Sequence, residues 1–382
     1  MKRSRWMLWA TAVVATWVLV LVAPRAQAAP AVRVLVPDSD NLQYVAFWAA
    51  KGAGYFDAEG VAVELLVPEV PAQAIARMIA GDAPVAVLPP PVYLQLVADR
   101  FPLQLVANLL QNDPIDLVVR RSLFERRHMD AHAPLRDRLQ SLQGLRVGVA
   151  PGPPARLRAL FASVGLDADR DVKIVIRRGQ DQNAAFATDE CDALYAHTPY
   201  LEHAIDDQDA VMLVNQSSGE VPSLGMRQIH ALVVRNDFLA AQQPMVAAMV
   251  RAIARAEALV HSDLAATEDA VMRAIPSMDR RHLHTLLGLY QAAVPASPRV
   301  SVDGLAPALV LFPANKTAPS LAGVPLADFV SPNLQGPPAV GLSVAAPTTA
   351  PSHRPVWPFA ATIGVLFALA AAGVSLRRRR RE

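Results

Sequence analysis

The chain has 382 residues, 53% of them hydrophobic, which is enough for two ordinary α/β lobes with further segments at the ends. Its formal net charge is +2, but residues 1–29 and 354–382 together carry ten basic residues and one acidic residue, which leaves 26 basic and 33 acidic residues and a net charge of −7 for 30–353. An acidic globular part argues against nucleic acid as a partner, and any anion that it binds must be held by local geometry.

Residues 1–28 have the three parts of an export signal. Basic residues at positions 2, 3 and 5 precede an apolar stretch over 6–22, and the small-x-small pattern at 26–28 predicts cleavage before Ala29. An uncleaved N-terminal anchor is the alternative. In either case the globular part is expected on the extracytoplasmic side of the membrane.

The globular part opens with a polar turn between a strand and a helix. Residues 32–36 are rich in β-branched side chains and end at Pro37, which predicts a strand. Polar residues at 38–41 can cap a helix, and apolar residues recur at helical spacing over 45–50. A second apolar run at 61–67 completes a βαβ unit. The turn thus lies at the carboxyl end of the first strand, where ligands bind in open α/β sheets.

This stretch resembles the opening of the periplasmic solute-binding proteins for nitrate, alkyl-sulfonates, taurine and the thiamine pyrimidine precursor. Gly54-Tyr55-Phe56 and the Glu-Gly-Val step at 59–61 match that family's pattern, with a generic βαβ unit as the alternative. The resemblance implies an α/β fold of two lobes, the type II periplasmic binding protein fold, in which each lobe is a mixed sheet flanked by helices. It also implies a small-molecule ligand in the cleft between the lobes, and the permease and ATPase of an ABC-type importer as partners.

Two turns of the first lobe carry candidate ligand contacts. The turn at 38–44 offers Ser39, Asn41 and Tyr44, with a polar group and a ring among them. The strand predicted over 85–88 ends in three prolines, and the resemblance places Pro89 and Pro90 against the ligand. Because proline lacks an N–H donor, these residues are expected to supply shape and apolar contact. A rigid surface turn is the alternative for the prolines.

The second lobe is expected to span 120–226, after a first part of lobe 1 over 29–119 that ends at a crossing strand near 116–119. A strand at 145–149 followed by a glycine turn and a helix resembles the start of the second lobe, and it makes Gly152 and Pro153 candidate contacts. A helix start favours an anion, but prolines there remove donors, which keeps a neutral or aromatic ligand open. Arg156 is interpreted as an exposed residue on the helix face, with ligand contact as the alternative.

A third polar turn follows the strand predicted near 191–194. Tyr195, His197 and Thr198 are its polar candidates, and the turn is expected to face 38–44 across the cleft. A surface or structural role is the alternative for His197. The chain then returns to lobe 1 over 227–330, through a strand at 229–234 and an amphipathic helix at 244–259.

The C-terminal part contains a second membrane signal. Residues 331–355 are rich in proline and alanine and predict a spacer. The stretch 356–376 is uncharged and long enough to cross a bilayer, and the arginine-rich tail 377–382 is expected to stay in the cytoplasm. A permanent anchor in the inner membrane is preferred, and a C-terminal sorting signal is the alternative.

These features together predict a membrane-tethered, extracytoplasmic solute-binding protein of an ABC-type importer. A flat, weakly charged ligand such as a thiamine-pyrimidine precursor is expected more than nitrate or a sulfonate. No enzymatic activity, catalytic residue, cofactor or metal site is expected: there is one cysteine, Cys191, and the pair His282 and His284 lies two residues apart, on different sides of a helix. The alternatives are a membrane-anchored or surface-sorted sensor or binding protein without a transporter and, as a third class, an enzyme of pyrimidine precursor synthesis.

Overall fold

The structure is a computed structural model that describes residues 31–39, 41–68, 73–311, 321, 323–331 and 334. The predicted export signal 1–28, most of the spacer 331–355, the predicted membrane helix 356–376 and the tail 377–382 lie outside these residues. Within the described part, no helix is both long and apolar enough to cross a membrane.

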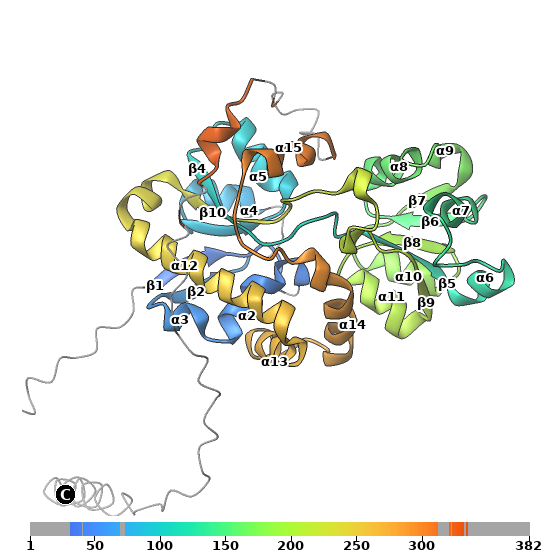
Figure 1. Cartoon of the computed structure of the whole chain (residues 1–382), viewed down its shortest axis with the longest axis horizontal. Coiled ribbons are helices and arrows are strands. Elements are labelled where there is room, and N and C mark those ends of the chain that lie inside the picture. Colours follow the sequence, from blue (N-terminus) through green and yellow to red (C-terminus); the bar gives the residue numbers. More distant parts are fainter. Residues whose placement is uncertain are drawn as a thin grey trace, which may run out of the picture. The chain divides into compact units, whose positions relative to one another are not determined.

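The first lobe is built on a five-stranded sheet with the order β2-β1-β3-β10-β4 (Figure 1). Its strands are β1 (Ala31–Leu35), β2 (Ala62–Leu66), β3 (Val85–Leu88), β4 (Leu103–Asn108) and β10 (Ala231–Arg235). β1 pairs in parallel with β2 and β3, whereas β10 runs antiparallel to β3 and β4. Every residue of β3 is buried, which is typical of a central strand with both faces covered.

Helices from three parts of the chain surround this sheet. They are η1 (Leu42–Tyr44), α2 (Val45–Gly52), α3 (Tyr55–Ala58), α4 (Ala74–Ala80), α5 (Pro90–Ala98), α12 (Asn236–Ser262), α13 (Leu264–Ala274), α14 (Arg280–Tyr290), η5 (Gln291–Ala293), α15 (Val302–Leu311) and η6 (Leu326–Phe329). The helix predicted over 244–259 is longer than expected. It is interrupted at Gln242, two residues before Pro244, because proline cannot continue the preceding helical hydrogen bonds.

The second lobe repeats this topology with the order β7-β6-β8-β5-β9. Its strands are β5 (Asp116–Arg120), β6 (Arg146–Val149), β7 (Lys173–Ile176), β8 (Ala193–Ala196) and β9 (Ala210–Val214). Its helices are α6 (Arg121–Arg126), α7 (Leu135–Gln140), α8 (Pro154–Ala162), α9 (Ala168–Asp171), α10 (Asp181–Ala187), α11 (Tyr200–Gln208), η3 (Gln216–Ser218) and η4 (Pro222–Leu224). Two mixed sheets flanked by helices agree with the predicted fold class.

Each sheet contains one strand that arrives from the other lobe. β5 runs antiparallel between β8 and β9, so the strand at 116–120 belongs to the second sheet and the first crossing lies before it, at 109–115. This places the boundary a few residues earlier than the predicted position 119, because pairing with β8 is a non-local property. The return crossing enters β10, and the two crossings are hydrogen bonded side by side, with Leu109 N donating to the carbonyl oxygen of His230 at 2.8 Å and Ile229 N to that of Leu110 at 2.8 Å.

Candidate functional site

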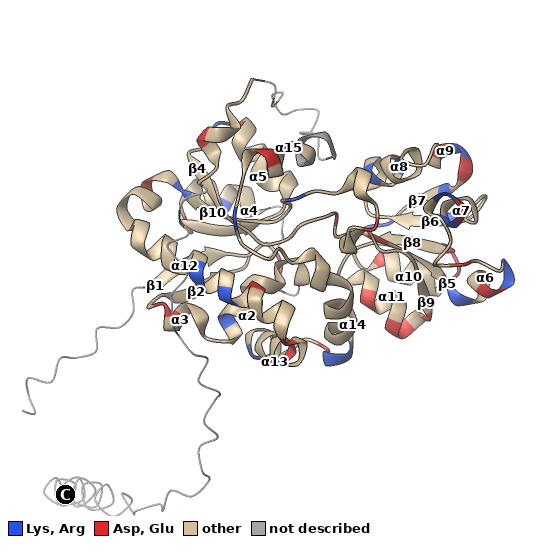
Figure 2. Ribbon diagram, viewed as in Figure 1, with Lys and Arg blue, Asp and Glu red and all other residues tan. Residues whose placement is uncertain are grey.

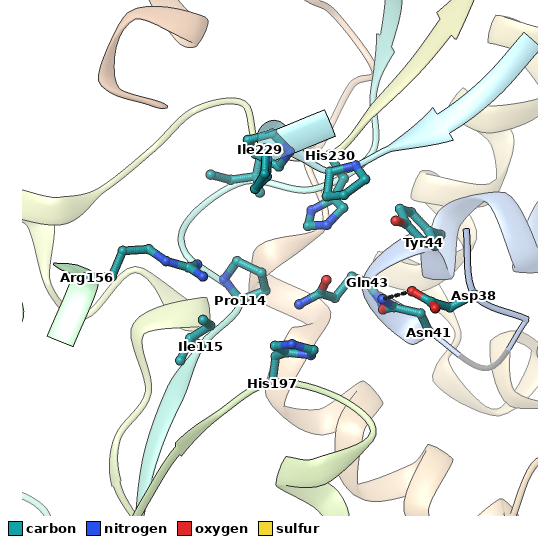
Figure 3. Close-up of a pocket in the computed structure, with 13 residues that line it drawn as sticks. Asp38, Asn41, Gln43, Tyr44, Pro114, Ile115, Arg156, His197, Ile229 and His230 are labelled. Carbon is teal, nitrogen blue, oxygen red and sulfur yellow. Dashed lines mark hydrogen bonds between the residues drawn. The ribbon is translucent and has the colours of Figure 1, made fainter. Parts of the chain in front are cut away.

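A cavity of about 220 Å³ lies where both lobes meet the crossings (Figure 3). The first lobe lines it with Asp38, Asn41, Gln43, Tyr44 and Pro89 to Pro91, the crossings with Pro114, Ile115, Ile229 and His230, and the second lobe with Arg156 and His197. Apart from the crossing residues, the lining comes from the segments that follow β1 and β3, from α8 after β6 and from the turn after β8, so the cavity lies at the carboxyl ends of these strands, as expected for a ligand site in this class of sheet.

The turn after β1 holds its polar side chains in fixed positions. Asn41 caps η1, because its Oδ1 accepts a hydrogen bond from Gln43 N at 2.9 Å. Its Nδ2 faces Asp38 Oδ2 at 3.4 Å, and its carbonyl oxygen accepts from Trp48 Nε1 at 3.1 Å. Trp48 is fully buried in the first core. The core therefore sets the position of the two predicted contacts, Asn41 and Tyr44, at the cavity.

His230 lies at the cavity as a buried ring, and sequence reasoning missed it. The residue is 2% exposed, and neither Nδ1 nor Nε2 has a hydrogen-bond partner within the described protein. Its ring lies edge-to-face with Tyr44, with 5.2 Å between ring centroids. Burial lowers the pKa of His230 to about 3, with further lowering by His197 and Arg156. The neutral imidazole can therefore offer one donor and one acceptor at the same time.

Arg156 supplies a cation from α8, and its interpretation as an exposed residue is wrong. Its side chain is only 12% exposed, and its Nη1 donates to Asp113 Oδ1 at 2.6 Å. Asp113 lies on the first crossing with a side chain that is 2% exposed, and its Oδ2 is buried without a described partner. Burial raises the pKa of Asp113, and the charge and hydrogen bond of Arg156 act against that shift. The pair joins the second lobe to the crossing beside the cavity.

Of the three contacts predicted around the end of β8, the described cavity is lined by His197, whereas Tyr195 lies within β8 itself. His197 lines the cavity, its Nδ1 is bonded to the carbonyl oxygen of Thr198, and burial lowers its pKa to about 4. Thr198 and Tyr195 are fully buried: the threonine Oγ1 donates to Glu202 Oε1 at 2.7 Å, and the tyrosine hydroxyl donates to Gln216 Oε1 at 2.9 Å. Both side chains therefore support the second lobe, and Tyr195 belongs to its hydrophobic core.

The remaining predicted contacts divide between two that line the cavity and three that do not. Pro89 and Pro90 line the cavity, and Pro90 also begins α5. Ser39 and Gly152 are exposed, and Pro153 is buried at the start of α8; the described lining of the cavity includes none of the three. The lining residues that sequence reasoning missed include Gln43, Pro114, Ile115 and Ile229. The signal that could have pointed to the first crossing is the polar-proline step Asp113-Pro114 just before β5.

Comparisons with known proteins agree with this fold. The alkanesulfonate-binding protein SsuA from Xanthomonas axonopodis, bound to MOPS, is 15% identical over 78% of this chain and 98% of its own, with a TM-score of 0.55. The periplasmic sulfonate-binding protein SsuA from Methylobacillus flagellatus is 16% identical over 81% and 93%, with a TM-score of 0.59. The desulfurization enzyme DszB, as a variant with biphenyl-2-sulfinic acid, is 16% identical over 79% and 97%, with a TM-score of 0.54. At these identities the likeness establishes the fold alone.

A comparison with curated proteins finds no match. The family model described as NMT1/THI5 like matches residues 41–263, more than half of the chain, from the turn after β1 to the end of α12. The resemblance found in the sequence is thereby confirmed, and the chain belongs to the NMT1/THI5-like family.

Proposed function

We propose that the chain is the extracytoplasmic solute-binding subunit of an ABC-type importer, and that it binds a flat, weakly charged organic molecule in the cavity between its lobes. The observation that carries the proposal is the cavity itself, which is lined from both lobes and both crossings. In such an arrangement a ligand bridges the lobes, and closure about a hinge depends on the ligand being present.

The lining favours a neutral heteroaromatic ligand over nitrate or a small sulfonate. Three consecutive prolines, Pro89 to Pro91, offer no N–H donors. The guanidinium of Arg156 is already paired with Asp113, and the two imidazoles are neutral. One nitrogen of the neutral His230, beside the ring of Tyr44, can pair with a ring nitrogen or an amino group of a flat heteroaromatic ligand such as an aminopyrimidine.

Binding fits the described site better than catalysis by the chain's single cysteine. Cys191 is buried in the core, away from the cavity lining, and burial raises the pKa of its thiol. A buried thiol of raised pKa is a poor nucleophile. The likeness to the enzyme DszB therefore contributes to this proposal only through the fold.

Ligand class is tested with the purified full chain by native mass spectrometry followed by thermal unfolding with added compounds. A substituted aminopyrimidine should raise the melting temperature, because a ligand that binds only the folded state stabilises it by mass action. Nitrate and a short alkyl-sulfonate serve as the comparison compounds. Stabilisation by these anions and none by the pyrimidine would contradict the proposed ligand class while leaving the binding function in place.

Tethering is a separate part of the proposal and rests on the sequence pattern of 356–376 and the arginines after it. Truncation after Ser352 should release the protein from the membrane fraction into the periplasmic fraction. Recovery of the full-length chain in the osmotic-shock fluid would contradict a permanent anchor and favour C-terminal cleavage.

A further inference from the structure

Three side chains with metal-ligating atoms meet outside the cavity, between two helices. His203 and Asp207 lie on α11, and His282 lies on α14. α11 packs against the second sheet, whereas α14 packs against α13, which in turn packs against α2 of the first lobe (Figure 1). The three residues therefore join a helix of the second lobe to the helices that follow the return crossing.

The ligating atoms converge on one carboxylate oxygen. His203 and Asp207 are four residues apart, which places both side chains on one face of α11. Asp207 Oδ2 lies 2.7 Å from His203 Nδ1 and 2.9 Å from His282 Nε2, and the three ligating atoms all lie within 4.8 Å of one another. The two imidazole rings are close, with 4.1 Å between centroids.

We propose that His203, Asp207 and His282 bind one zinc-like divalent transition-metal ion that links α11 to α14. Zinc binds imidazole nitrogens and carboxylate oxygens at about 2.0–2.2 Å. In a tetrahedral site with these bond lengths the ligating atoms are roughly 3.4 Å apart, so the distance from each imidazole nitrogen to Asp207 Oδ2 must increase when the ion binds. The side chains of His203 and Asp207 are 46% and 33% exposed, so they have room for that adjustment, and solvent can supply a fourth ligand. His282 is the fixed partner, with a side chain that is 9% exposed.

The charges around the three residues favour a cation. Asp206 and Asp279 add a carboxylate on each helix, and Figure 2 shows acidic residues along α11. Arg281 is the opposing charge: it donates to the other oxygen of Asp207, Oδ1, and to the carbonyl oxygen of Asp206 at 2.9 Å. Its bond leaves Oδ2 to face the imidazoles.

His284 provides a matched control on the same helix. It lies two residues after His282, and its side chain is 76% exposed. Its Nδ1 lies 2.6 Å from Glu268 Oε1 on α13, so it faces a different neighbour. Loss of this imidazole removes a histidine of the same helix without touching the proposed site.

The test uses the full chain purified without a histidine tag, stripped with chelator and titrated with Zn²⁺ in equilibrium dialysis with metal analysis. We expect one high-affinity Zn²⁺ per chain and a rise in melting temperature on loading. His203→Ala and Asp207→Asn should each weaken zinc binding by at least about tenfold and reduce the rise at a given zinc concentration. Mg²⁺ should neither bind nor stabilise, because it prefers an all-oxygen site.

His284→Ala should bind zinc as the unaltered chain does. The proposal is overturned if the unaltered chain takes up no stoichiometric zinc, or if His203→Ala and Asp207→Asn bind zinc with unchanged affinity. It is equally overturned if His284→Ala weakens binding as much as they do. Because His203 and Asp207 are partly exposed, circular dichroism of the zinc-free variants should match that of the unaltered chain, which separates loss of the site from loss of the fold.

Discussion

The turn after β1 in the first lobe lines the cavity with polar side chains from Asp38 to Tyr44, whereas the corresponding turn after β6 in the second lobe lines it only through Arg156, in the following helix. The two sheets have the same strand order, so topology does not explain the difference. The difference is explained by the prolines at the start of α8, because Pro153 and Pro154 have no backbone N–H to donate to a ligand. The long side chain of Arg156 is therefore the polar group that this part of the second lobe brings to the cavity.

The largest effect is expected from removing that side chain. Arg156→Met leaves the Asp113 carboxylate buried without its cation, which should cost about 3–5 kcal/mol of unfolding free energy and weaken ligand binding strongly. Urea denaturation and ligand titration measure the two effects. The double variant Arg156→Met with Asp113→Leu removes both charges, so it should recover much of the stability and none of the binding. A single variant as stable as the unaltered chain would show that the pair does not join lobe and crossing.

The two tyrosines first expected to face each other across the cleft provide the next contrast. Tyr195→Ala should cost about 3–5 kcal/mol, because its ring fills the second core, whereas Tyr195→Phe should cost about 1 kcal/mol through the lost bond to Gln216. Once a ligand is known, Tyr195→Phe should leave its affinity unchanged, and Tyr44→Leu should weaken it about tenfold or more. If Tyr195→Phe bound the ligand more weakly at unchanged stability, the Tyr195 hydroxyl would have to take part in ligand binding.

Local patterns predicted most of the scaffold. Strand runs bounded by Pro and Gly, such as 32–36 and 85–88, appear in the sheets within a residue or two, because their boundaries depend on nearby chemistry. The capping residue Asn41 was visible for the same reason. The family resemblance supplied the two-lobe arrangement, which no local pattern shows.

Contacts made across the sequence escaped prediction. Arg156 resembled a surface arginine, because its partner Asp113 is 43 residues earlier on a crossing. His230 gave no signal, because its burial depends on Tyr44 and on the neighbouring crossing. Tyr195 was expected at the cleft but lies in the second core. The sequence pattern at a strand end shows which residues point to opposite faces of the sheet, but it does not show which face is buried.

The two crossings each bring a buried titratable group to the strand that enters the opposite sheet. Asp116 begins β5 and is fully buried, with both oxygens accepting hydrogen bonds at 2.9 Å from Ser217, one from N and one from Oγ. Burial raises its pKa to about 7 despite those bonds. His230 directly precedes β10, and burial lowers its pKa to about 3. Both groups are therefore favoured in their neutral form. The Asp116 contribution lowers stability as pH rises from about 4 to 7, and the His230 contribution lowers it as pH falls from about 6.5 to 3.

Asp116→Asn tests the acid of this pair. Between pH 4 and 7 the unfolded chain has lost the Asp116 proton while the folded chain keeps it, so stability falls as pH rises through this window. The variant keeps a neutral side chain with the same shape at every pH. Its unfolding free energy relative to that of the unaltered chain should therefore increase by about 2–4 kcal/mol as the pH is raised from 4 to 8. Denaturant midpoints at several pH values measure the gain. A difference between the two proteins that does not vary with pH would mean that Asp116 is ionised in the fold.

His230→Phe tests the base and is expected to give the smallest effect. The unfolded imidazole protonates near pH 6.5 and the folded one only near pH 3, so the unaltered chain loses stability as pH falls below about 6.5. The variant keeps a ring beside Tyr44 and has no imidazole to protonate. When the pH is lowered from 7.5 to 5, the unfolding free energy of the variant should therefore fall by about 2 kcal/mol less than that of the unaltered chain. The pKa of His197 is lowered in both proteins, so its contribution cancels in the comparison.

The pH dependence of ligand affinity tests the same residue. Because His230 is neutral in the unliganded protein, affinity for an uncharged ligand should stay constant from about pH 5.5 to 8, and the variant should bind about tenfold more weakly because it lacks one hydrogen bond. Affinity that rises steeply as pH falls through 6.5 would instead indicate that His230 binds its ligand as an imidazolium, and the ligand would then be an anion.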